Sequence, residues 1–155
     1  MAYPLDALRA ACERVVVVAK RDTELPALGV ERWDEPDDPR HPIAGITHAL
    51  ERAAGPILVC AADMPFVGPD VLRLIAAGLR PGVKAAVAVC DGRLEPLLAA
   101  YAPEALELLA AAPAGEPLRR SVESLTPALV EVAPAVVFNV NTPADLAEAE
   151  RRLRS

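Results

Sequence analysis

Three short runs of apolar residues constrain the fold of this chain more than any other feature. They are Val15–Ala19, Pro56–Ala61 and Ala85–Cys90. A strand with this composition is covered on both faces, which is typical of parallel sheets that carry helices on either side. Between the runs lie segments with helical spacing of apolar residues, and these provide the crossovers that parallel strands need. The sequence therefore predicts an α/β sandwich of the Rossmann type with a mostly parallel sheet.

Further elements follow from turn residues and from prolines, many of which fall at the edges of elements. The pair Asp91-Gly92 predicts a tight turn into Leu94–Tyr101, which makes an antiparallel neighbour plausible. A short strand is predicted at Leu129–Val132. The predicted helices are Pro4–Glu13, the segment from His41-Pro42 through Ala53, Pro69–Leu79, Pro103–Ala111, Pro117–Leu125 and a last helix that starts at Pro143 after a Thr142 cap. We expect residues 1–155 to form a single domain.

Composition excludes some classes of function. The net charge of -6 argues against nucleic acid, whose phosphates select basic surfaces, although an acidic protein can still bind a nucleotide through magnesium and local amides. The three cysteines are widely spaced in apolar surroundings, which favours reduced thiols over disulfides or zinc. No signal peptide and no apolar run near the roughly 20 residues of a membrane span are found. We therefore expect a cytoplasmic protein that uses neither nucleic acid nor a membrane.

Polar residues that could form a site lie in two places: after the second predicted buried strand and just before the last helix. Asp63 lies just beyond the Pro56–Ala61 run, where open α/β sheets place ligand groups, and its carboxylate could hold magnesium on a nucleotide triphosphate. The alternative is a simple N-cap. Asn139 and Asn141 would share one face if their segment is extended. They are candidates for a polar site, and capping is the competing interpretation.

Other candidates carry weaker signals. Lys20 follows the Val15–Ala19 run on the expected ligand side, and Asp34 falls in an acidic segment predicted to be a solvated loop. Gly45, close after His41, precedes a helix N-terminus that could attract an anion. Arg119 and Arg120 stand near a helix start, where a phosphate or pterin ligand would explain two cations, although a solvated pair is the commoner arrangement.

No nucleophile with an adjacent base is recognisable, and His41 and His48 are the only histidines. This absence favours direct transfer to a bound acceptor over covalent catalysis.

Taken in their order along the chain, several segments resemble the molybdenum cofactor guanylyltransferases, which are related to sugar-phosphate and cofactor nucleotidyltransferases. The matching segments are Val15–Arg21, His41–Gly45, Leu58–Phe66 with Asp-Met-Pro-Phe, Glu95–Ala99 with Tyr101, and Phe138–Pro143 with Asp145-Leu146. The Asp-x-Pro and Asn-x-Asn-Thr-Pro pieces are the most specific part of this resemblance.

The resemblance implies a nucleotide-diphospho-sugar transferase type of three-layer sandwich that joins GMP from GTP to molybdopterin and releases pyrophosphate. It implies that Asp63 binds Mg²⁺ and that Asn139 and Asn141 lie near the reacting groups. By the same matching, Lys20, Asp34 and Gly45 are nucleotide-binding positions. Lys20 departs from the family, which often has asparagine there.

The resemblance further implies that Arg119 and Arg120 face the molybdopterin side. Possible protein partners are a receiving molybdoenzyme or another protein of cofactor biosynthesis.

The family opens with a strand and a Leu-Ala-Gly-Gly loop that have no counterpart in these 155 residues. Relative to the family the chain is therefore truncated at its N-terminus, and its first strand is missing. A start codon placed too late is the explanation we favour over genuine loss of the loop. Because base choice depends largely on that segment, a cytidylyltransferase of the same fold stays open. A non-catalytic molybdopterin-binding protein is the alternative from another class.

Overall fold

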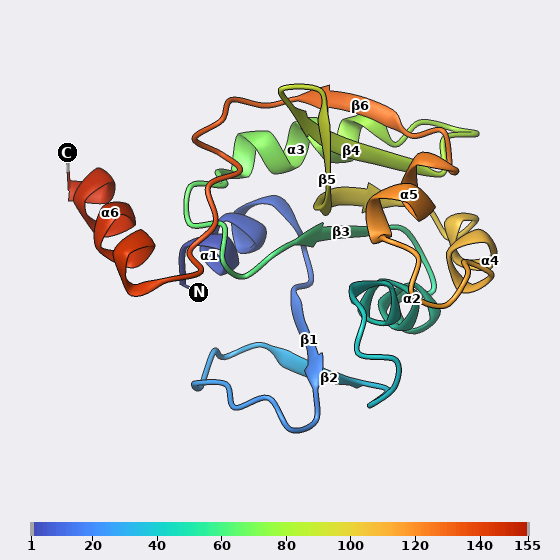
Figure 1. Cartoon of the computed structure of the whole chain (residues 1–155), viewed down its shortest axis with the longest axis horizontal. Coiled ribbons are helices and arrows are strands. Elements are labelled where there is room, and N and C mark those ends of the chain that lie inside the picture. Colours follow the sequence, from blue (N-terminus) through green and yellow to red (C-terminus); the bar gives the residue numbers. More distant parts are fainter. Residues whose placement is uncertain (1, 155) are drawn as a thin grey trace.

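The computed structural model describes residues 2–154 (Figure 1). Its elements are α1 (Ala2–Ala11), β1 (Val16–Lys20), β2 (Glu31–Glu35), α2 (Pro42–Ala53), β3 (Ile57–Cys60), α3 (Pro69–Gly78), β4 (Ala85–Cys90), β5 (Arg93–Tyr101), α4 (Ala105–Ala110), α5 (Leu118–Glu123), β6 (Ala128–Glu131) and α6 (Pro143–Arg154). Each helix and strand expected above is present, and its ends agree with the expectation to within two residues. The strand β2 was not predicted.

The strands form two sheets. β1 and β2 pair in parallel, and the second sheet has the order β3-β5-β4-β6. In this second sheet β4 and β6 are parallel, while β5 is antiparallel to both β3 and β4. The antiparallel strand follows the expected turn, in which Asp91 and Gly92 both have positive φ, as a two-residue hairpin turn requires. The α/β class is confirmed.

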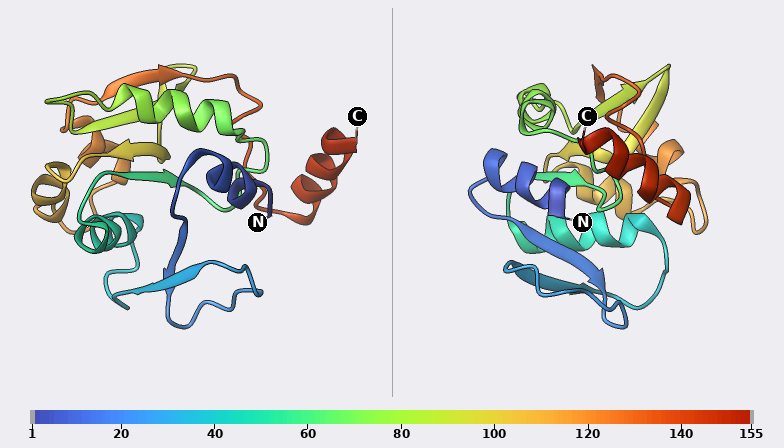
Figure 2. Two further views of the ribbon diagram at one scale, coloured as in Figure 1. Left: turned by 180° about the vertical axis from the view of Figure 1, so that it is seen from behind. Right: turned by 90° about the vertical axis from the view of Figure 1, so that its left-hand side faces the viewer.

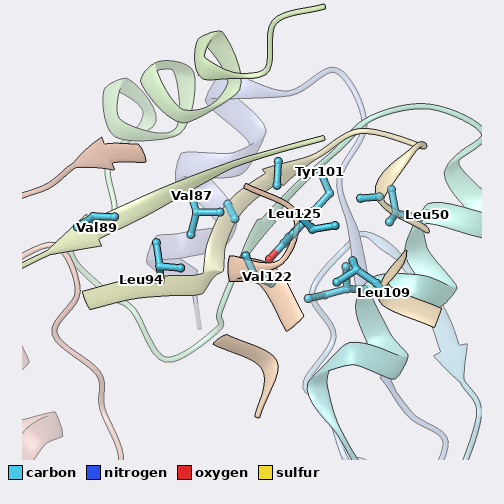
Figure 3. Packing of buried hydrophobic residues seen from close by; sticks show 12 residues of the cluster. Leu50, Val87, Val89, Leu94, Tyr101, Leu109, Val122 and Leu125 are labelled. Atoms are coloured by element: carbon cyan, nitrogen blue, oxygen red, sulfur yellow. The ribbon is translucent and has the colours of Figure 1, made fainter. Parts of the chain in front are cut away.

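Helices cover both faces of the four-stranded sheet, so the molecule has three layers (Figure 2). On one face α1 and α3 pack over a cluster that includes Leu72, Ile75 and Leu98. On the other face α2, α4 and α5 enclose a second cluster, centred on Val87 and Tyr101 (Figure 3). The burial of this apolar surface is the main force that holds the layers together.

α3 approaches β4 closely at Gly78. A Cβ atom added at this position would lie 2.9 Å from the Cβ of Ala86 and 3.4 Å from the Cγ2 of Val130. The absence of a side chain therefore allows the end of α3 to rest directly on the sheet.

α6 extends away from the three layers (Figure 1). Its start is capped as predicted: the Asp145 N–H donates to the Thr142 Oγ1 at 3.1 Å, and the Thr142 N–H donates to the Asp145 carboxylate at 2.8 Å. Throughout residues 2–154, the helices are too short or too polar to traverse a lipid bilayer.

Candidate functional site

Asp63 lies in the loop after β3, at the carboxyl end of the strand, where a ligand group was expected. The side chain is partly buried. The backbone carbonyl of Asp63 accepts a hydrogen bond of 2.8 Å from the N–H of Val140. This bond joins the loop after β3 to the loop before α6, although the two are far apart in the sequence.

An aromatic pair holds the same two loops together. The rings of Phe66 and Phe138 lie with their centroids 5.7 Å apart in a tilted arrangement. The guanidinium of Arg152, on α6, lies over the Phe138 ring at 4.8 Å. The junction between the two loops therefore combines an apolar contact between Phe66 and Phe138 with the polar residues Asp63 and Asn139.

Asn139 carries an unsatisfied polar atom at this junction. Its Oδ1 is buried and has no hydrogen-bond partner within the described residues. A buried acceptor left unpaired costs about 1–3 kcal/mol, so such an atom is a good candidate for contact with a ligand or an ion. The structure thus places Asn139 and Asp63 in adjoining loops.

Asn141 has a different position. The stretch Val136–Asn141 belongs to no strand: residues 134–137 form a turn in which the Val136 N–H donates to the Ala133 carbonyl at 2.9 Å, and residues 138–141 are irregular. The condition for two asparagines on one strand face is therefore not met. Asn141 is exposed, and its backbone N–H donates to Asp145 at 3.1 Å within the cap of α6.

The thiol nearest to this site is chemically inert. Burial raises the pKa of Cys60 to about 12, and the negative charge of Asp63 acts in the same direction. The thiol stays protonated at neutral pH, so Cys60 is not a nucleophile here.

The residues around Asp63 fit one kind of metal site. Within residues 2–154 there is no cluster of three or more histidine, cysteine, aspartate or glutamate side chains that could enclose an ion. Magnesium, however, is usually held by one or two carboxylates together with water and substrate phosphates. The Asp63 carboxylate, with the unpaired Asn139 Oδ1 in the next loop, suits an ion that arrives with a nucleotide.

Lys20 is occupied by contacts within the fold. Its Nζ donates to the carbonyl of Pro36 and, at 2.9 Å, to that of Pro39, and it lies 3.6 Å from the Glu35 carboxylate. Only 11% of its side chain is exposed. Lys20 therefore holds the loop between β2 and α2 in place.

The expectation that Asp34 lies in a solvated loop is wrong. Asp34 is in β2, where it pairs with Ala19 of β1, and its exposed carboxylate accepts a 2.7 Å hydrogen bond from Arg32. The strand forms because β1 offers a partner edge and Trp33 is buried beneath β2. Pairing of this kind overrides the weak strand propensity of an acidic segment.

Glu35 is a candidate that the sequence analysis missed. Its Oε2 is buried without a hydrogen-bond partner in the described chain and faces Gly45, where an added Cβ would lie 3.2 Å from it. Gly45 thus lets the start of α2 approach the end of β2. The available signal was the two-residue spacing of Glu31, Trp33 and Glu35, which puts the three side chains on one strand face.

Arg119 and Arg120 are tied to another part of the fold. The Nε of Arg119 donates to the Leu94 carbonyl at the start of β5, at 3.1 Å, and Arg120 lies 3.7 Å from Glu116. The side chain of Arg120 is 79% exposed. These contacts lead to β5 and α5, and not to the loops that carry Asp63 and Asn139.

Comparison with known proteins identifies related sequences. The family model described as the MobA-like NTP transferase domain matches residues 1–145. The "Probable molybdenum cofactor guanylyltransferase" of Bacillus licheniformis is 35% identical over 85 residues, which are 54% of this chain and 44% of that protein. The molybdenum cofactor guanylyltransferase of Rhizobium leguminosarum bv. trifolii is 32% identical over 130 residues, or 74% and 62% of the two chains. The matched region is thus less than two thirds of either relative.

Solved structures show the same architecture. Molybdopterin-guanine dinucleotide biosynthesis protein A from Archaeoglobus fulgidus superposes with a TM-score of 0.70 at 31% identity, over 90% of this chain and 78% of that one. The 2-C-methyl-D-erythritol 4-phosphate cytidylyltransferase of Thermus thermophilus has a TM-score of 0.72 at 24% identity, with 99% and 88% covered. The second similarity concerns the fold alone.

Proposed function

The chain belongs to the family of MobA-like NTP transferase domains, and on this premise we propose that it transfers GMP from GTP to molybdopterin with release of pyrophosphate. The names of the two curated relatives and of the Archaeoglobus structure support this choice of nucleotide and acceptor.

One observation carries the proposal: the backbone hydrogen bond from Val140 to Asp63, which joins the loop of Asp63 to the loop of Asn139, whose buried amide oxygen lacks a hydrogen-bond partner in the described residues. A nucleotidyltransferase needs such a polar site at the carboxyl ends of the strands, because charge on the triphosphate must be neutralised there. The bound Mg²⁺ would supply this neutralisation and polarise the phosphate.

The residues of this chain position the reacting groups. Asp63 would hold the metal-bound triphosphate, and Asn139 would orient either the α-phosphate or the acceptor through its free Oδ1. The acceptor is a phosphate that is already ionised at neutral pH, so no general base is required. This agrees with a site that contains neither a histidine nor a reactive thiol.

The remaining candidates have supporting roles in this proposal. Lys20 and Asp34, at the ends of β1 and β2, shape the nucleotide side, and Gly45 leaves room for the approach of α2. Asn141 maintains the loop through its place in the α6 cap. The exposed Arg120 is available to an anionic acceptor, whereas Arg119 anchors α5 to β5.

A cytidylyltransferase is the second candidate. The Thermus thermophilus cytidylyltransferase has the same fold over 99% of this chain, so the fold is compatible with either nucleotide. A non-catalytic molybdopterin carrier is a third candidate, and it would not need the Asp63 carboxylate.

The test compares Asp63→Asn with Asp70→Asn. Asp70 is a suitable control because its side chain is 97% exposed on α3 and pairs only at the surface with Arg73, at 2.9 Å. Each protein is titrated calorimetrically with magnesium-GTP and magnesium-CTP, and pyrophosphate release is measured with GTP and molybdopterin. We expect Asp63→Asn to lower turnover by about 100-fold or more, a typical effect of losing an electrostatic group at a reacting centre, and Asp70→Asn to leave it unchanged.

Each alternative has its own signature. Turnover with CTP but not GTP would identify a cytidylyltransferase. Molybdopterin binding without pyrophosphate release, equal in both variants, would identify a carrier. Equal turnover in the two variants would show that Asp63 has no part in the reaction.

A further inference from the structure

β6 is an outer strand of the larger sheet, at the opposite end from β3. It lies beside α3, and no described strand pairs with its far edge (Figure 1). The N–H of Val132, just after β6, donates to the Val89 carbonyl of β4 at 2.9 Å. Because neighbouring residues of a strand direct their N–H and C=O groups to opposite sides, those of Leu129 and Glu131 point outward, away from β4. This edge can therefore accept another strand.

The surface along this edge is apolar. A groove of about 380 Å³ lies between the end of α3 and β6. It is lined by Leu74 and Leu129, which are 56% and 61% exposed and are the two most exposed large apolar side chains in residues 2–154. Ala128 and Val130 pack into the cluster under α3, so Leu129, which alternates with them, projects from the other face of the sheet. The edge is thus apolar on both faces, whereas solvent-facing edges usually carry charges or prolines.

The same groove carries one charge of each sign, on Arg80 and Glu131. Neither side chain forms an ion pair or a hydrogen bond within the described residues. The Arg80 carbonyl accepts a 2.9 Å hydrogen bond from the Val83 N–H, just before β4 begins. β4 and β6 are parallel with Ala86 opposite Ala128, so Arg80 lies toward the start of β6. Glu131 is the last residue of β6, and the two charges therefore stand toward opposite ends of the strand.

We propose that this edge is the interface of a homodimer, in which β6 of one copy pairs antiparallel with β6 of a second copy around a two-fold axis. The pairing joins two four-stranded sheets into one, with the order β3-β5-β4-β6-β6-β4-β5-β3. It covers Leu129 on one face and brings the two α3 helices, with Leu74, next to each other on the opposite face. A two-fold interface needs a self-complementary surface, and an apolar edge with opposite charges toward its two ends is one.

The charges also select the register of the two strands. Through their outward groups, a two-fold pair can set Leu129 opposite Leu129, Leu129 opposite Glu131, or Glu131 opposite Glu131 of the second copy. The last brings like charges together, and the second sets a carboxylate against an apolar side chain. With Leu129 opposite Leu129, Glu131 lies opposite Pro127 of the second copy, at the end of the strand where the second copy's Arg80 lies. Both unpaired charges of each copy then face an opposite charge.

The test reverses these charges in the whole chain and measures the molecular mass by sedimentation equilibrium at micromolar concentrations. We expect the unchanged chain to be a dimer, and Arg80→Glu and Glu131→Arg each to weaken dimerisation at least about tenfold, because each sets like charges against one another at both ends of the interface. An equimolar mixture of the two variants should dimerise again, since every charge pair between the two chains then joins opposite signs. Mixing could not restore an ion pair that forms inside one chain.

Leu129→Lys tests the apolar part of the interface, and we expect it to abolish the dimer. Its control is Leu108→Lys, at an exposed position on α4 outside the groove, which should leave the dimer intact. Circular dichroism checks that both variants keep the fold. In the unchanged chain, amides of β6 should exchange at least about tenfold more slowly at high than at low protein concentration, whereas those of β5 should not.

Three results would overturn the proposal. They are a chain that is monomeric at every concentration, a dimer that persists in Leu129→Lys, and a mixture of Arg80→Glu with Glu131→Arg that stays monomeric. A dimer whose formation slows exchange in strands other than β6 would place the interface elsewhere and would also overturn it.

Discussion

Polar groups in this fold differ in whether the protein itself satisfies them. The ammonium group of Lys20 is engaged by the loop carbonyls of Pro36 and Pro39, so it stabilises the fold before any ligand is present. The Oδ1 of Asn139 and the Oε2 of Glu35 are buried and have no hydrogen-bond partner in the described residues, although the Lys20 ammonium lies 3.6 Å from the Glu35 Oε2. Unsatisfied buried atoms of this kind distinguish ligand-contacting candidates from residues that serve the fold.

The cap of α6 yields a prediction about pH. The Thr142 hydroxyl, followed by the backbone N–H of Asn141, holds the pKa of Asp145 below its usual value of 3.8. Because the pKa is lower in the folded state, the cap stabilises α6 fully above that usual value and loses its effect as the pH falls through the lowered pKa. We expect Thr142→Ala to shift the pKa of Asp145 back towards 3.8, as measured by NMR titration of its carboxyl carbon.

A matched variant for this titration is Thr47→Ala. The Thr47 hydroxyl bonds the Ile43 carbonyl inside α2, at 3.0 Å, and has no contact with α6 among the hydrogen bonds of the structure. It should leave the Asp145 titration unchanged. The same titration curve in Thr142→Ala and the wild type would refute the role of the hydroxyl.

At the scale of elements, the register between β5 and β4 shifts partway along the two strands. Val87 of β4 pairs with Ala99, but the next residue, Ala88, pairs with Glu95, so residues 96–98 bulge out of the β4–β5 ladder. Pro96 lies in this bulge, where its missing N–H breaks no hydrogen bond. The hydroxyl of the buried Tyr101 donates to the Pro96 carbonyl at 2.7 Å and ties the bulge to the end of the strand.

The bulge predicts a stability effect for Tyr101→Phe. The substitution keeps the ring but leaves the Pro96 carbonyl without its donor inside the core, and we expect a loss of about 1–2 kcal/mol in the free energy of unfolding. Urea denaturation followed by circular dichroism measures the change. Tyr3→Phe is the control, because Tyr3 is 53% exposed on α1 and should have little effect. Equal midpoints for the two variants would contradict this account of the bulge.

At the scale of the whole molecule, burial is unevenly divided between the two sheets. The residues of β4 lie between α3 on one face and the helices α4 and α5 on the other, and none is exposed. The β1–β2 pair shares α2 with the larger sheet but keeps several half-exposed apolar residues. Regions with less buried apolar surface open locally at lower free energy than the core.

This division predicts two levels of amide protection. Amides of β4 and β5 should exchange only through global unfolding, whereas those of β1 and β2 should exchange through a partial opening at least about tenfold more frequent. Native-state hydrogen exchange in low concentrations of denaturant separates the two cases by their dependence on denaturant. A single exchange free energy for β1, β2, β4 and β5 would show that the two sheets unfold as one unit.

Elements specified by neighbouring residues could be predicted from the sequence, whereas elements that depend on contacts between distant segments could not. Ala85–Cys90 matches β4 at both ends, since an unbroken apolar run between turn residues is a local signal. β2 was missed because Glu31–Glu35 has little strand propensity of its own and is extended only through pairing with β1. Within the candidate site, the position of Asp63 at a strand end was predictable, while the buried environment of Glu35 was not.

The sequence alone determined the order of the helices and of the described strands other than β2, the antiparallel turn at Asp91-Gly92 and the cap at Thr142, because periodicity, turn residues and caps act over a few neighbouring positions. Tertiary structure decided that the loop of Asp63 contacts the loop of Asn139 and that the Lys20 ammonium group donates its hydrogen bonds to loop carbonyls. It also decided that, within residues 2–154, β1 pairs with β2 and β3 pairs with β5. These features depend on which distant segments come into contact, and no local pattern of residues specifies that.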